Sequence, residues 1–490
     1  MSNLSSLWLV TREYAGIAEA GGVKNVACSL AEGLVRKGLT VKVFIPRYGC
    51  VRQEGLPAGI IRITIMDKVY EVTFSRFELH GVVIILVGSR IFSEKKAVYT
   101  YTDAEEHSIT GASRGKGHFD TDSMNVLLQK AVIEWALMTQ EVPDIIHCQD
   151  AHTAILPALI RCNAQIASFF SRTACVVTIH NAGPGYRQSI PSLARASYLT
   201  GLDESCLARS LLNGNVEPFL LSEQYGNVTT VSPWYANELT SSAYNALTEG
   251  LSGEFEKRKT VITGIINGID YHRYEPSDTT RSLLPFSFDP IRDDFAGKYA
   301  CRDYFIDWVS RSLETPHLTC FGTLEDDPHA VYFSYHGRIV WQKGLDVFEE
   351  TARIVLDHVP TARFVILGQG DPVLEGLLAR TSMRYPGRFV FIRGYERTLA
   401  RLAVAISDFI VLPSMFEPCG LEDYIAQIFA TIPVAHAVGG LQKIIAGENG
   451  FVYRSDQHGS QESQVSVLAP LLIELAQPVV ESSGRGCASV

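Results

Sequence analysis

The sequence predicts an α/β protein with two doubly wound parallel-sheet domains. Three observations predict this class. Short runs of β-branched and apolar residues alternate with segments of helical period along most of the 490 residues. The alternation stops in a polar, proline-bearing stretch after residue 267 and resumes near residue 331. Each half also carries two adjacent glycines after a strand, Gly21-Gly22 and Gly439-Gly440, where open parallel sheets bind ligands.

The first half opens as strand, loop, helix and strand. Apolar residues recur at helical spacing over 23–36, and strands are expected on either side, over 7–11 and 40–46. Residues 60–88 depart from this order, because their alternation favours an antiparallel excursion from the sheet. The order then resumes with these elements: a helix over 122–139 and strands over 144–148, 173–179, 227–231 and 261–266.

The second half repeats the pattern after a turn at Asn267-Gly268-Ile269-Asp270 and the polar Pro276-Ser277-Asp278. Its strands are expected over 331–335, 363–367, 389–392, 409–412 and 433–435, with helices in the gaps. We therefore predict a first domain over 1–272, a second over 273–455, and a divergent or shortened tail over 456–490. A ligand crevice is expected between the two domains.

The composition excludes several classes of protein. Lys and Arg number 43 against 53 Asp and Glu, and a net charge of −10 argues against a general binder of nucleic acid or anionic membrane. The ten cysteines form no C-x-x-C pair, and scattered thiols are typical of a reducing compartment. No apolar run approaches the roughly 18 residues of a membrane span. A cytoplasmic protein is expected.

Candidate ligand contacts follow several predicted strands. Glycine turns allow close backbone approach and free N–H groups, which favour phosphate, although each is also compatible with a plain tight turn. Arg338 and Lys343 lie before a predicted helix, where cations oppose the helix dipole; they are candidates for a diphosphate, or else solvated cations. Glu417 is a candidate for gripping sugar hydroxyls, or else a carboxylate that complements the next helix.

A metal site is not expected. His147 and His152 flank Asp150, but a zinc site would need a third ligand that the sequence does not identify, and substrate contact is the preferred interpretation. The pair Asp120 and Asp122 precedes a helix, so helix capping is preferred to chelation of a metal–nucleotide.

Taken together, these segments resemble the glycogen and starch synthase family of retaining glycosyltransferases, whose two Rossmann-like domains form the GT-B fold. The resemblance spans most of residues 7–453. Its strongest part is Glu417-Pro418-Cys419-Gly420-Leu421 followed by Gly439-Gly440-Leu441. Weaker matches in the same order are Pro46-Arg47-Tyr48-Gly49, Thr178-Ile179-His180-Asn181, Val231-Ser232-Pro233, Asn267-Gly268-Ile269-Asp270 and Gln342-Lys343-Gly344-Leu345-Asp346.

The resemblance implies transfer of glucose from ADP-glucose to the non-reducing end of an α-1,4-glucan primer (glycogen or a maltooligosaccharide) with retention, without metal or cofactor. It assigns the leaving diphosphate to Arg338 and Lys343, the glucosyl hydroxyls to Glu417, the side of the transferred sugar to His180, and a supporting role to Asp150. It assigns contacts to the nucleotide sugar to these residues: Gly21, Gly22, Asn181, Asn267, Tyr395, Cys419, Gly420, Leu421, Gly439, Gly440 and Leu441.

The chain departs from the family pattern at several positions. Glu19 stands where the family usually has a lysine before the glycines, with Lys24 as a possible substitute, and Met415 stands where it usually has arginine. After Tyr453 only a short linker and one apolar segment, 465–475, are found. Two alternative functions therefore stay open: a related transferase that makes a small glycoside, and a catalytically impaired homologue that binds glucan or nucleotide.

Overall fold

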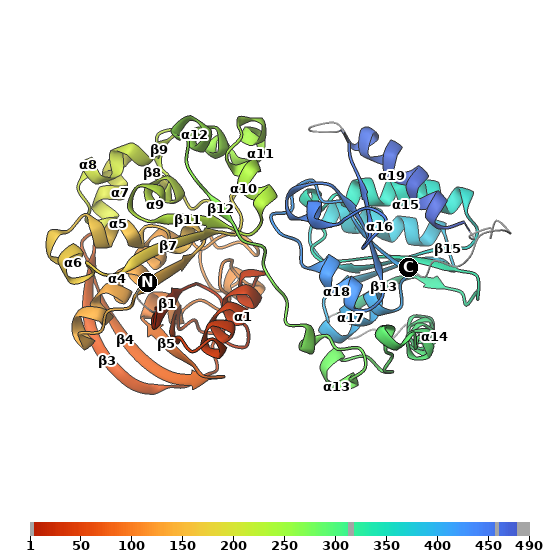
Figure 1. Ribbon diagram of the computed structural model, residues 1–490, viewed down its shortest axis with the longest axis horizontal. Helices are drawn as coiled ribbons and strands as arrows, with labels where there is room; N and C mark the ends of the chain where they lie inside the picture. Colours follow the sequence, from red (N-terminus) through yellow and green to blue (C-terminus); the bar gives the residue numbers. More distant parts are fainter. Residues whose placement is uncertain (1–3, 312–317, 456–459, 478–490) are drawn as a thin grey trace. The chain divides into compact units, whose positions relative to one another are not determined.

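The computed structural model describes residues 4–311, 318–455 and 460–477, which form two compact units, Met1–Gly268 and Ile269–Val490. The division falls four residues before the boundary expected from the sequence. Each unit is built on a mostly parallel sheet with helices around it (Figure 1), so the predicted class, two Rossmann-like α/β domains, is confirmed.

In the described part of the first unit, nine strands form a sheet in the order β12-β11-β7-β6-β1-β2-β5-β4-β3. Strand β4 pairs antiparallel with both β3 and β5, whereas β5 pairs parallel with β2, so the predicted antiparallel excursion is confirmed. The strands of this nine-stranded sheet are β1 Ser6–Val10, β2 Thr40–Pro46, β3 Leu56–Ile65, β4 Lys68–Leu79, β5 Val82–Gly88, β6 Ile145–Gln149, β7 Ala174–Ile179, β11 Asn227–Thr230 and β12 Thr263–Gly264. A small sheet joins β8 Ile190–Pro191, β10 Asn215–Val216 and β9 Leu211–Leu212.

The helix expected over 23–36 is present as α1. In α1 (Val23–Arg36) the buried side chains include Ala27, Cys28 and Ala31, which share one face. The other α-helices of the first unit are α2 Arg90–Ser93, α3 Asp103–Glu106, α4 Thr121–Thr139, α5 Leu156–Arg161, α6 Ala164–Phe169, α7 Leu193–Thr200, α8 Glu204–Leu207, α9 Pro218–Tyr225, α10 Pro233–Leu239, α11 Asn245–Thr248 and α12 Leu251–Arg258.

The helix-capping interpretation of Asp120 is wrong. Asp120 precedes α4, but its side chain makes no capping hydrogen bond, and its φ of −102° and ψ of 19° are not the extended conformation that capping requires. Its Oδ1 instead lies 2.8 Å from Lys95 Nζ, and Asp122 Oδ2 lies 3.3 Å from Arg195 Nη2. Both carboxylates therefore form ion pairs.

In the described part of the second unit, seven strands form a sheet in the order β13-β16-β15-β14-β17-β18-β19. They are β13 Leu318–Leu324, β14 Val331–His336, β15 Ala362–Gly368, β16 Arg388–Gly394, β17 Phe409–Leu412, β18 Ile432–His436 and β19 Phe451–Tyr453. Four phenylalanines stack side by side across the central strands, with ring centroids 5.2–6.2 Å apart: Phe409, Phe333, Phe364 and Phe389. This row fills one face of the core and fixes the register of the parallel strands.

Two layers of helices cover this sheet. Figure 1 shows α15 (Leu345–His358) and α16 (Pro372–Arg384) on one face, and α14 (Ala296–Ser310) and α17 (Arg397–Ala405) on the other. The remaining helices are α13 Thr279–Ser282, α18 Glu422–Ile428 and α19 Gln461–Leu475.

The second parallel series begins at Val331, the first residue of β14, as expected, but two elements that precede it were not predicted. Helix α14 and strand β13 come first, and β13 pairs antiparallel with β16. Gly322 lies in the middle of β13 with φ +83°, and the burial of the strand is irregular. A glycine-interrupted edge strand lacks the alternation on which a sequence-based prediction depends.

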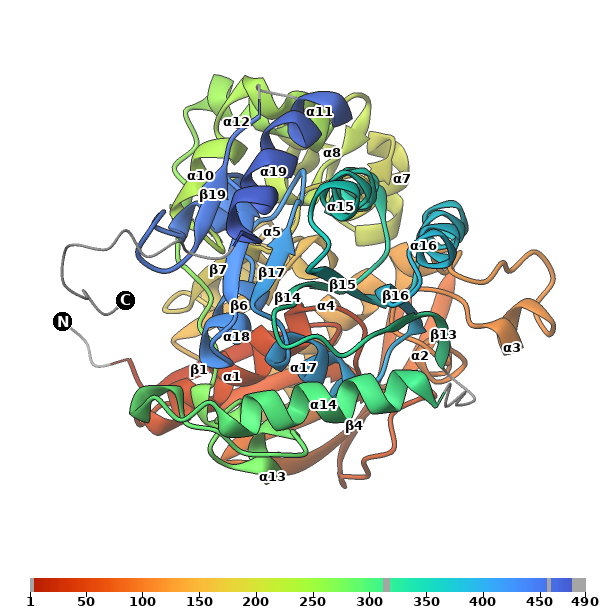
Figure 2. The ribbon, with the colours of Figure 1, turned by 90° about the vertical axis from the view of Figure 1, so that its right-hand side faces the viewer.

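The apolar segment predicted in the tail is the helix α19, which packs beside α15, as Figure 2 shows. Val465, Leu468 and Leu472 of α19 are buried in the same core cluster as the phenylalanine row. This segment is therefore part of the second unit. Residues 456–459 and 478–490 of the predicted tail lie outside the described residues.

A buried lysine joins three helices of the second unit. Lys298 Nζ donates to the carbonyl oxygens of Ala405 and Ser407 at 2.8 Å, to that of Phe429 at 3.0 Å, and to Thr431 Oγ1 at 3.1 Å. Burial lowers the pKa of this ammonium group to about 7. Lys298 thus satisfies carbonyl groups at and just beyond the ends of α17 and α18.

Candidate active site

The first unit contributes a loop held by Asp150. Because β6 and β7 are adjacent parallel strands, Asp150 and His180 meet at the same sheet edge. Asp150 Oδ1 accepts the backbone N–H groups of His180 at 2.9 Å and Asn181 at 3.3 Å. His180 Nε2 lies 2.7 Å from Gln149 Oε1. The predicted supporting acid therefore fixes the backbone of the His180 loop.

Burial determines the charge on both side chains. It raises the pKa of Asp150 to about 7, against the effect of the two backbone donors, and it lowers the pKa of His180 to about 3. His180 is therefore a neutral ring at neutral pH. A neutral ring can lie beside a sugar that gains positive charge without repelling it.

We expect Asp150→Asn to flatten the dependence of stability on pH. Between about pH 4 and pH 7 the folded state holds a proton on Asp150 that the unfolded state lacks. The stabilisation from this proton is therefore lost progressively over this range and is gone once the pH has risen through 7. Asparagine keeps the Oδ1 acceptor but cannot ionise. Urea unfolding from pH 4 to pH 8 should show the wild type losing stability relative to the variant, on the order of a few kcal/mol. Parallel pH profiles would contradict this assignment.

The glycine loop is tied to a buried carboxylate that the sequence analysis did not identify. Glu13 Oε2 accepts the N–H groups of Gly21 at 2.6 Å and Ala20 at 3.1 Å, and its Oε1 accepts the Tyr99 hydroxyl at 3.1 Å. Burial raises the pKa of Glu13. The Gly21 N–H, expected to be free for phosphate, is therefore hydrogen-bonded within the protein, and Gly22 lies at the start of α1.

The two charged residues beside this loop form an ion pair. Lys24 Nζ lies 3.5 Å from Glu19 Oε2, and Glu19 Oε1 accepts the Gly16 N–H at 2.6 Å. Lys24, considered above as a replacement for the family lysine, therefore offsets the charge of Glu19.

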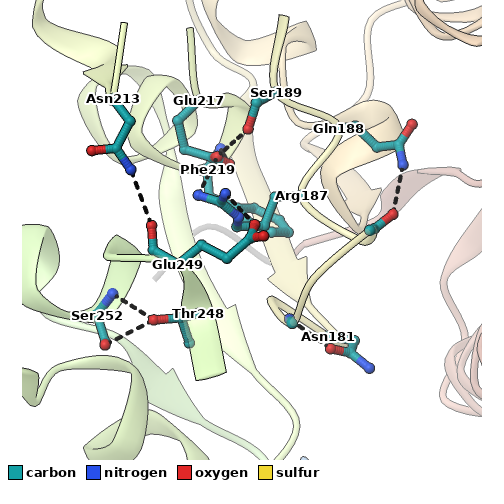
Figure 3. Close-up of polar contacts among 12 residues, drawn as sticks. Asn181, Arg187, Gln188, Ser189, Asn213, Glu217, Phe219, Thr248, Glu249 and Ser252 are labelled. Carbon is teal, nitrogen blue, oxygen red and sulfur yellow. Dashed lines mark hydrogen bonds and ion pairs between the residues drawn. The ribbon is translucent and has the colours of Figure 1, made fainter. Parts of the chain in front are cut away.

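The segment after Asn181 is held by a second buried carboxylate, shown in Figure 3. Glu217 is fully buried, and its Oε2 accepts hydrogen bonds from Ser189 Oγ at 2.7 Å and from Arg187 Nη1 at 3.3 Å. Arg187 Nη2 also donates to Glu249 Oε2 at 2.5 Å. Burial raises the pKa of Glu217 to about 7. Neither Arg187 nor Glu217 was predicted, although Glu217 before Pro218 carries a helix-start signal.

The second unit brings two predicted catalytic residues together. Lys343 follows β14, Glu417 follows β17, and these strands are neighbours. Lys343 Nζ forms an ion pair with Glu417 Oε2, which also accepts Ser414 Oγ at 3.3 Å. The Arg338 side chain is exposed, while its carbonyl oxygen accepts the Tyr335 hydroxyl at 2.8 Å. Lys343 is thus paired with the Glu417 carboxylate, and the Arg338 side chain faces solvent.

Two loop segments of the second unit that were predicted to contact the nucleotide sugar, Cys419–Leu421 and Gly439–Leu441, are hydrogen-bonded to a common lysine. The Gly440 N–H donates to the Glu417 carbonyl oxygen at 2.8 Å. Lys443 Nζ donates to the carbonyl oxygens of Cys419 at 2.7 Å, Gly420 at 3.0 Å and Gly440 at 3.2 Å. Lys443 therefore positions both segments.

The second glycine turn does not lead into an α-helix. Residues Gly439–Lys443 themselves form a single 3₁₀ turn, and the chain continues extended at Ile444 towards β19. The Lys443 side chain points into the protein, and the β-branched Ile444 and Ile445 with Gly447 disfavour a longer helix.

We expect Gly440→Ala and Gly22→Ala to differ sharply in stability. A Cβ at Gly440 would overlap the backbone of Cys419, whereas a Cβ at Gly22 would meet nothing within 4 Å. Gly440→Ala should lower the free energy of unfolding by about 1–3 kcal/mol, and Gly22→Ala should change it by less than about 1 kcal/mol. Urea unfolding of the two variants tests this, and equal losses would contradict the packing described.

The remaining predicted residues lie at the edges of these groups. Asn267 is half-buried next to the last residue of the first unit, and Tyr395 is exposed directly after β16. Near Tyr395, an ion pair that was not predicted joins His336 Nε2 to Glu422 Oε2 at 2.6 Å. Burial opposes charge on His336, but the Glu422 carboxylate raises its pKa overall.

Neither a metal cluster nor a membrane span is found in the part of the chain that the structure describes. Across residues 4–311, 318–455 and 460–477, no group of three or more His, Cys, Asp or Glu side chains could hold a metal ion. Over the same residues, no helix combines the length and apolar character that a bilayer crossing requires.

The sequence matches two family models. Residues 6–254 match the starch synthase catalytic domain, and residues 330–468 match the glycosyl transferases group 1. Among curated proteins, glycogen synthase from Aeromonas hydrophila is 27% identical over 465 residues, covering 90% of this chain and 84% of that protein. Glycogen synthase from Moorella thermoacetica is 28% identical over 473 residues, covering 93% and 87%.

Solved structures share the fold. The catalytic domain of starch synthase IV from Arabidopsis thaliana, bound to ADP and acarbose, matches with a TM-score of 0.78 and 22% identity, over 98% of this chain and 93% of that one. Sucrose-phosphate synthase from Thermosynechococcus elongatus matches with a TM-score of 0.53 and 15% identity, over 96% and 90%. Because the starch synthase catalytic domain model alone covers just over half of its residues, the chain belongs to that family, and it is a glycosyltransferase of the glycogen and starch synthase type.

Proposed function

We propose that this protein transfers glucose from ADP-glucose to the non-reducing end of an α-1,4-glucan, either glycogen or a maltooligosaccharide, with retention of configuration. The observation that carries the proposal is the pairing of Lys343 with Glu417 beside the Gly439–Leu441 turn. Lys343 supplies a cation that can bind a diphosphate, and Glu417 supplies a carboxylate that can accept hydrogen bonds from sugar hydroxyls. The backbone of the turn can bind either the diphosphate or the sugar.

In this proposal the donor separates Lys343 from Glu417. The bond between the diphosphate oxygen and the glucosyl C1 breaks as C1 bonds to the 4-hydroxyl oxygen of the primer, whose proton passes to the departing diphosphate. The Lys343 ammonium and the exposed Arg338 guanidinium stabilise the negative charge that grows on the diphosphate. Glu417, released from the lysine, accepts hydrogen bonds from glucosyl hydroxyls. In the first unit, Asp150 holds the backbone of the His180 loop, and the neutral His180 ring is the group that we assign to the transferred sugar.

We propose that the reaction needs no metal or cofactor, since two cationic side chains can balance the leaving diphosphate. The partners proposed are the nucleotide sugar and the glucan primer, with no nucleic acid and no membrane. We also propose a cytoplasmic location. The free thiols of the described cysteines support a reducing compartment.

The test is incubation of the full chain with glycogen and ADP-glucose or UDP-glucose, each labelled in the glucose. We expect label in ethanol-precipitated glycogen, at a higher rate from ADP-glucose. A labelled product that stays soluble would favour synthesis of a small glycoside. Binding of ADP or maltooligosaccharide without any transfer would favour the impaired homologue. Either result would overturn the proposed function.

A further inference from the structure

An arginine in the segment that follows His180 is held by two carboxylates. This segment of the first unit, residues 181–190, leads from the end of β7 to β8, and Figure 3 shows Arg187 directed towards Glu217 and Glu249. Its Nη1 lies 3.3 Å from Glu217 Oε2, and its Nη2 lies 2.5 Å from Glu249 Oε2. Because Glu217 precedes α9 and Glu249 follows α11, these ion pairs join three stretches of chain that are distant in the sequence.

Other groups hold the two ends of this segment. At its start Asp150 accepts the Asn181 N–H at 3.3 Å, and at its end β8 pairs antiparallel with β10. In the middle, over residues 183–188, the hydrogen bonds and ion pairs that reach beyond the segment within the described chain are those of Arg187 and one hydrogen bond of 3.5 Å from Asn125. Arg187 therefore supplies most of the polar contacts that fix this middle part.

The backbone is strained on both sides of the Arg187–Glu249 ion pair. Gln188, the residue after Arg187, has φ +53°, and Glu249 has φ +50°. Residues with a side chain rarely adopt this left-handed conformation, and they keep it where the surrounding structure requires it. The ion pair is therefore part of a structure that fixes the backbone of this segment in one conformation.

The two carboxylates differ in exposure. Glu217 is fully buried, whereas the side chain of Glu249 is 49% exposed. Two charged groups, Arg187 and Glu249, act on Glu217 together with two neutral donors, the Ser189 hydroxyl and the Phe219 N–H. Burial raises the pKa of Glu217 to about 7, and the Ser189 and Arg187 donors oppose this rise. When Glu217 is protonated, Arg187 keeps a charged partner only in Glu249, and an ion pair in contact with solvent stabilises little.

We propose that Arg187 and Glu217 are positioning residues for the acceptor, and that their ion pair holds residues 183–188 in the conformation that binds the α-glucan primer. This inference rests on the proposed function, which assigns His180, immediately before the segment, to the transferred sugar. The cations assigned to the diphosphate belong to the second unit, which leaves the stretch next to His180 for the acceptor. The half-buried Tyr186 in this stretch carries an aromatic ring and a hydroxyl, a combination that suits a sugar chain.

The proposal predicts an effect of pH that depends on Glu217. Above about pH 7 the Glu217 carboxylate is ionised and holds Arg187, so the affinity for primer should be highest there. As the pH falls through this value the carboxylate gains a proton, and the affinity should fall. Asp150 also ionises near pH 7, so the wild-type profile contains both effects. Glu217→Gln separates them, because glutamine keeps an acceptor oxygen but cannot ionise.

The test is isothermal titration of the full chain with maltoheptaose, in the absence of a donor, at pH 6 and at pH 8. We expect Arg187→Met to weaken binding about tenfold at pH 8, and Arg187→Lys to recover part of this loss. Glu217→Gln should bind more weakly than the wild type at pH 8 and equally well at pH 6. The matched control is Arg195→Met, which removes an exposed arginine of the same unit whose ion pair in the described chain is with Asp122. It should bind as the wild type does.

Three results would overturn the proposal. One is the absence of maltoheptaose binding by the wild type, and another is unchanged affinity in Arg187→Met at pH 8. The third is a difference between Glu217→Gln and the wild type that is the same at both pH values, as a merely structural role would give. This third comparison decides the matter if Arg187→Met does not fold.

The titration requires no catalysis, so it separates this inference from the proposed function. The expected binding pattern without any transfer of glucose would overturn the proposed function and leave the positioning of a bound glucan supported. Transfer of glucose with unchanged binding in the variants would overturn this inference alone. In transfer assays, the KM for maltoheptaose should follow the order of the measured affinities, and the KM for ADP-glucose should not change.

Discussion

Lys343→Ala is expected to lower kcat for transfer from ADP-glucose by about 100- to 1,000-fold. The lysine lies at the carboxyl end of β14 and is held there by Glu417. The charge of Lys343 acts on the leaving diphosphate. Its stabilising interaction is therefore stronger in the transition state than in the complex with bound primer. Initial rates measured against ADP-glucose and against glycogen separate these effects, and the KM for glycogen should change little.

The control for this variant is Lys257→Ala, which removes an exposed lysine whose ion pair in the described part of the chain is with the neighbouring Glu254. It should keep full activity. The unfolding midpoint of Lys343→Ala should be compared with that of the wild type, because Glu417 retains Ser414 as a donor when the lysine is absent. Loss of glycogen affinity with unchanged kcat would contradict the role assigned to Lys343.

Lys443→Met is expected to lower the free energy of unfolding by about 3–5 kcal/mol. Its ammonium lies 3.0 Å from Asp423 Oδ1, with side-chain exposures of 7% for the lysine and 0% for the aspartate. Burial raises the pKa of Asp423 to about 6, although the lysine opposes this. Removing the lysine leaves a buried carboxylate and three carbonyl groups without their donor. Urea unfolding measures the loss.

A double variant separates the effect of the unpaired Asp423 charge on stability from the effect of the lost Lys443 hydrogen bonds. Lys443→Met combined with Asp423→Asn removes the unpaired charge, so it should recover part of the stability that the single variant loses. Lys257→Met breaks an exposed pair and should cost less than about 1 kcal/mol. If Lys443→Met were no less stable than Lys257→Met, the lysine would not hold the two loop segments.

Much of the fold could be predicted because its strands are apolar and β-branched. The helix over 23–36 and the strands over 40–46 and 409–412 have the expected ends. The strand expected over 261–266 is reduced to Thr263–Gly264, and Val261, Ile265 and Ile266 are exposed. Apolar residues alone do not show whether a neighbouring strand is present to complete the ladder.

The candidate site could be predicted only where its residues lie in short loops after strands. Lys343 and Glu417 were found this way, and neighbouring strands bring them together. Glu13, Glu217 and Lys443 were missed. Each is charged and buried, and each holds backbone or side-chain groups distant in sequence. Sequence spacing does not reveal which groups need a partner, because tertiary packing decides it.

Chain elongation can be observed by mass spectrometry of maltoheptaose incubated with the full chain and ADP-glucose. We expect a ladder of products, each one glucosyl unit longer than the last, which β-amylase degrades because the new bonds are α-1,4. An unchanged maltoheptaose peak, with the protein folded and ADP-glucose intact, would contradict the assignment of this chain as a glucan synthase.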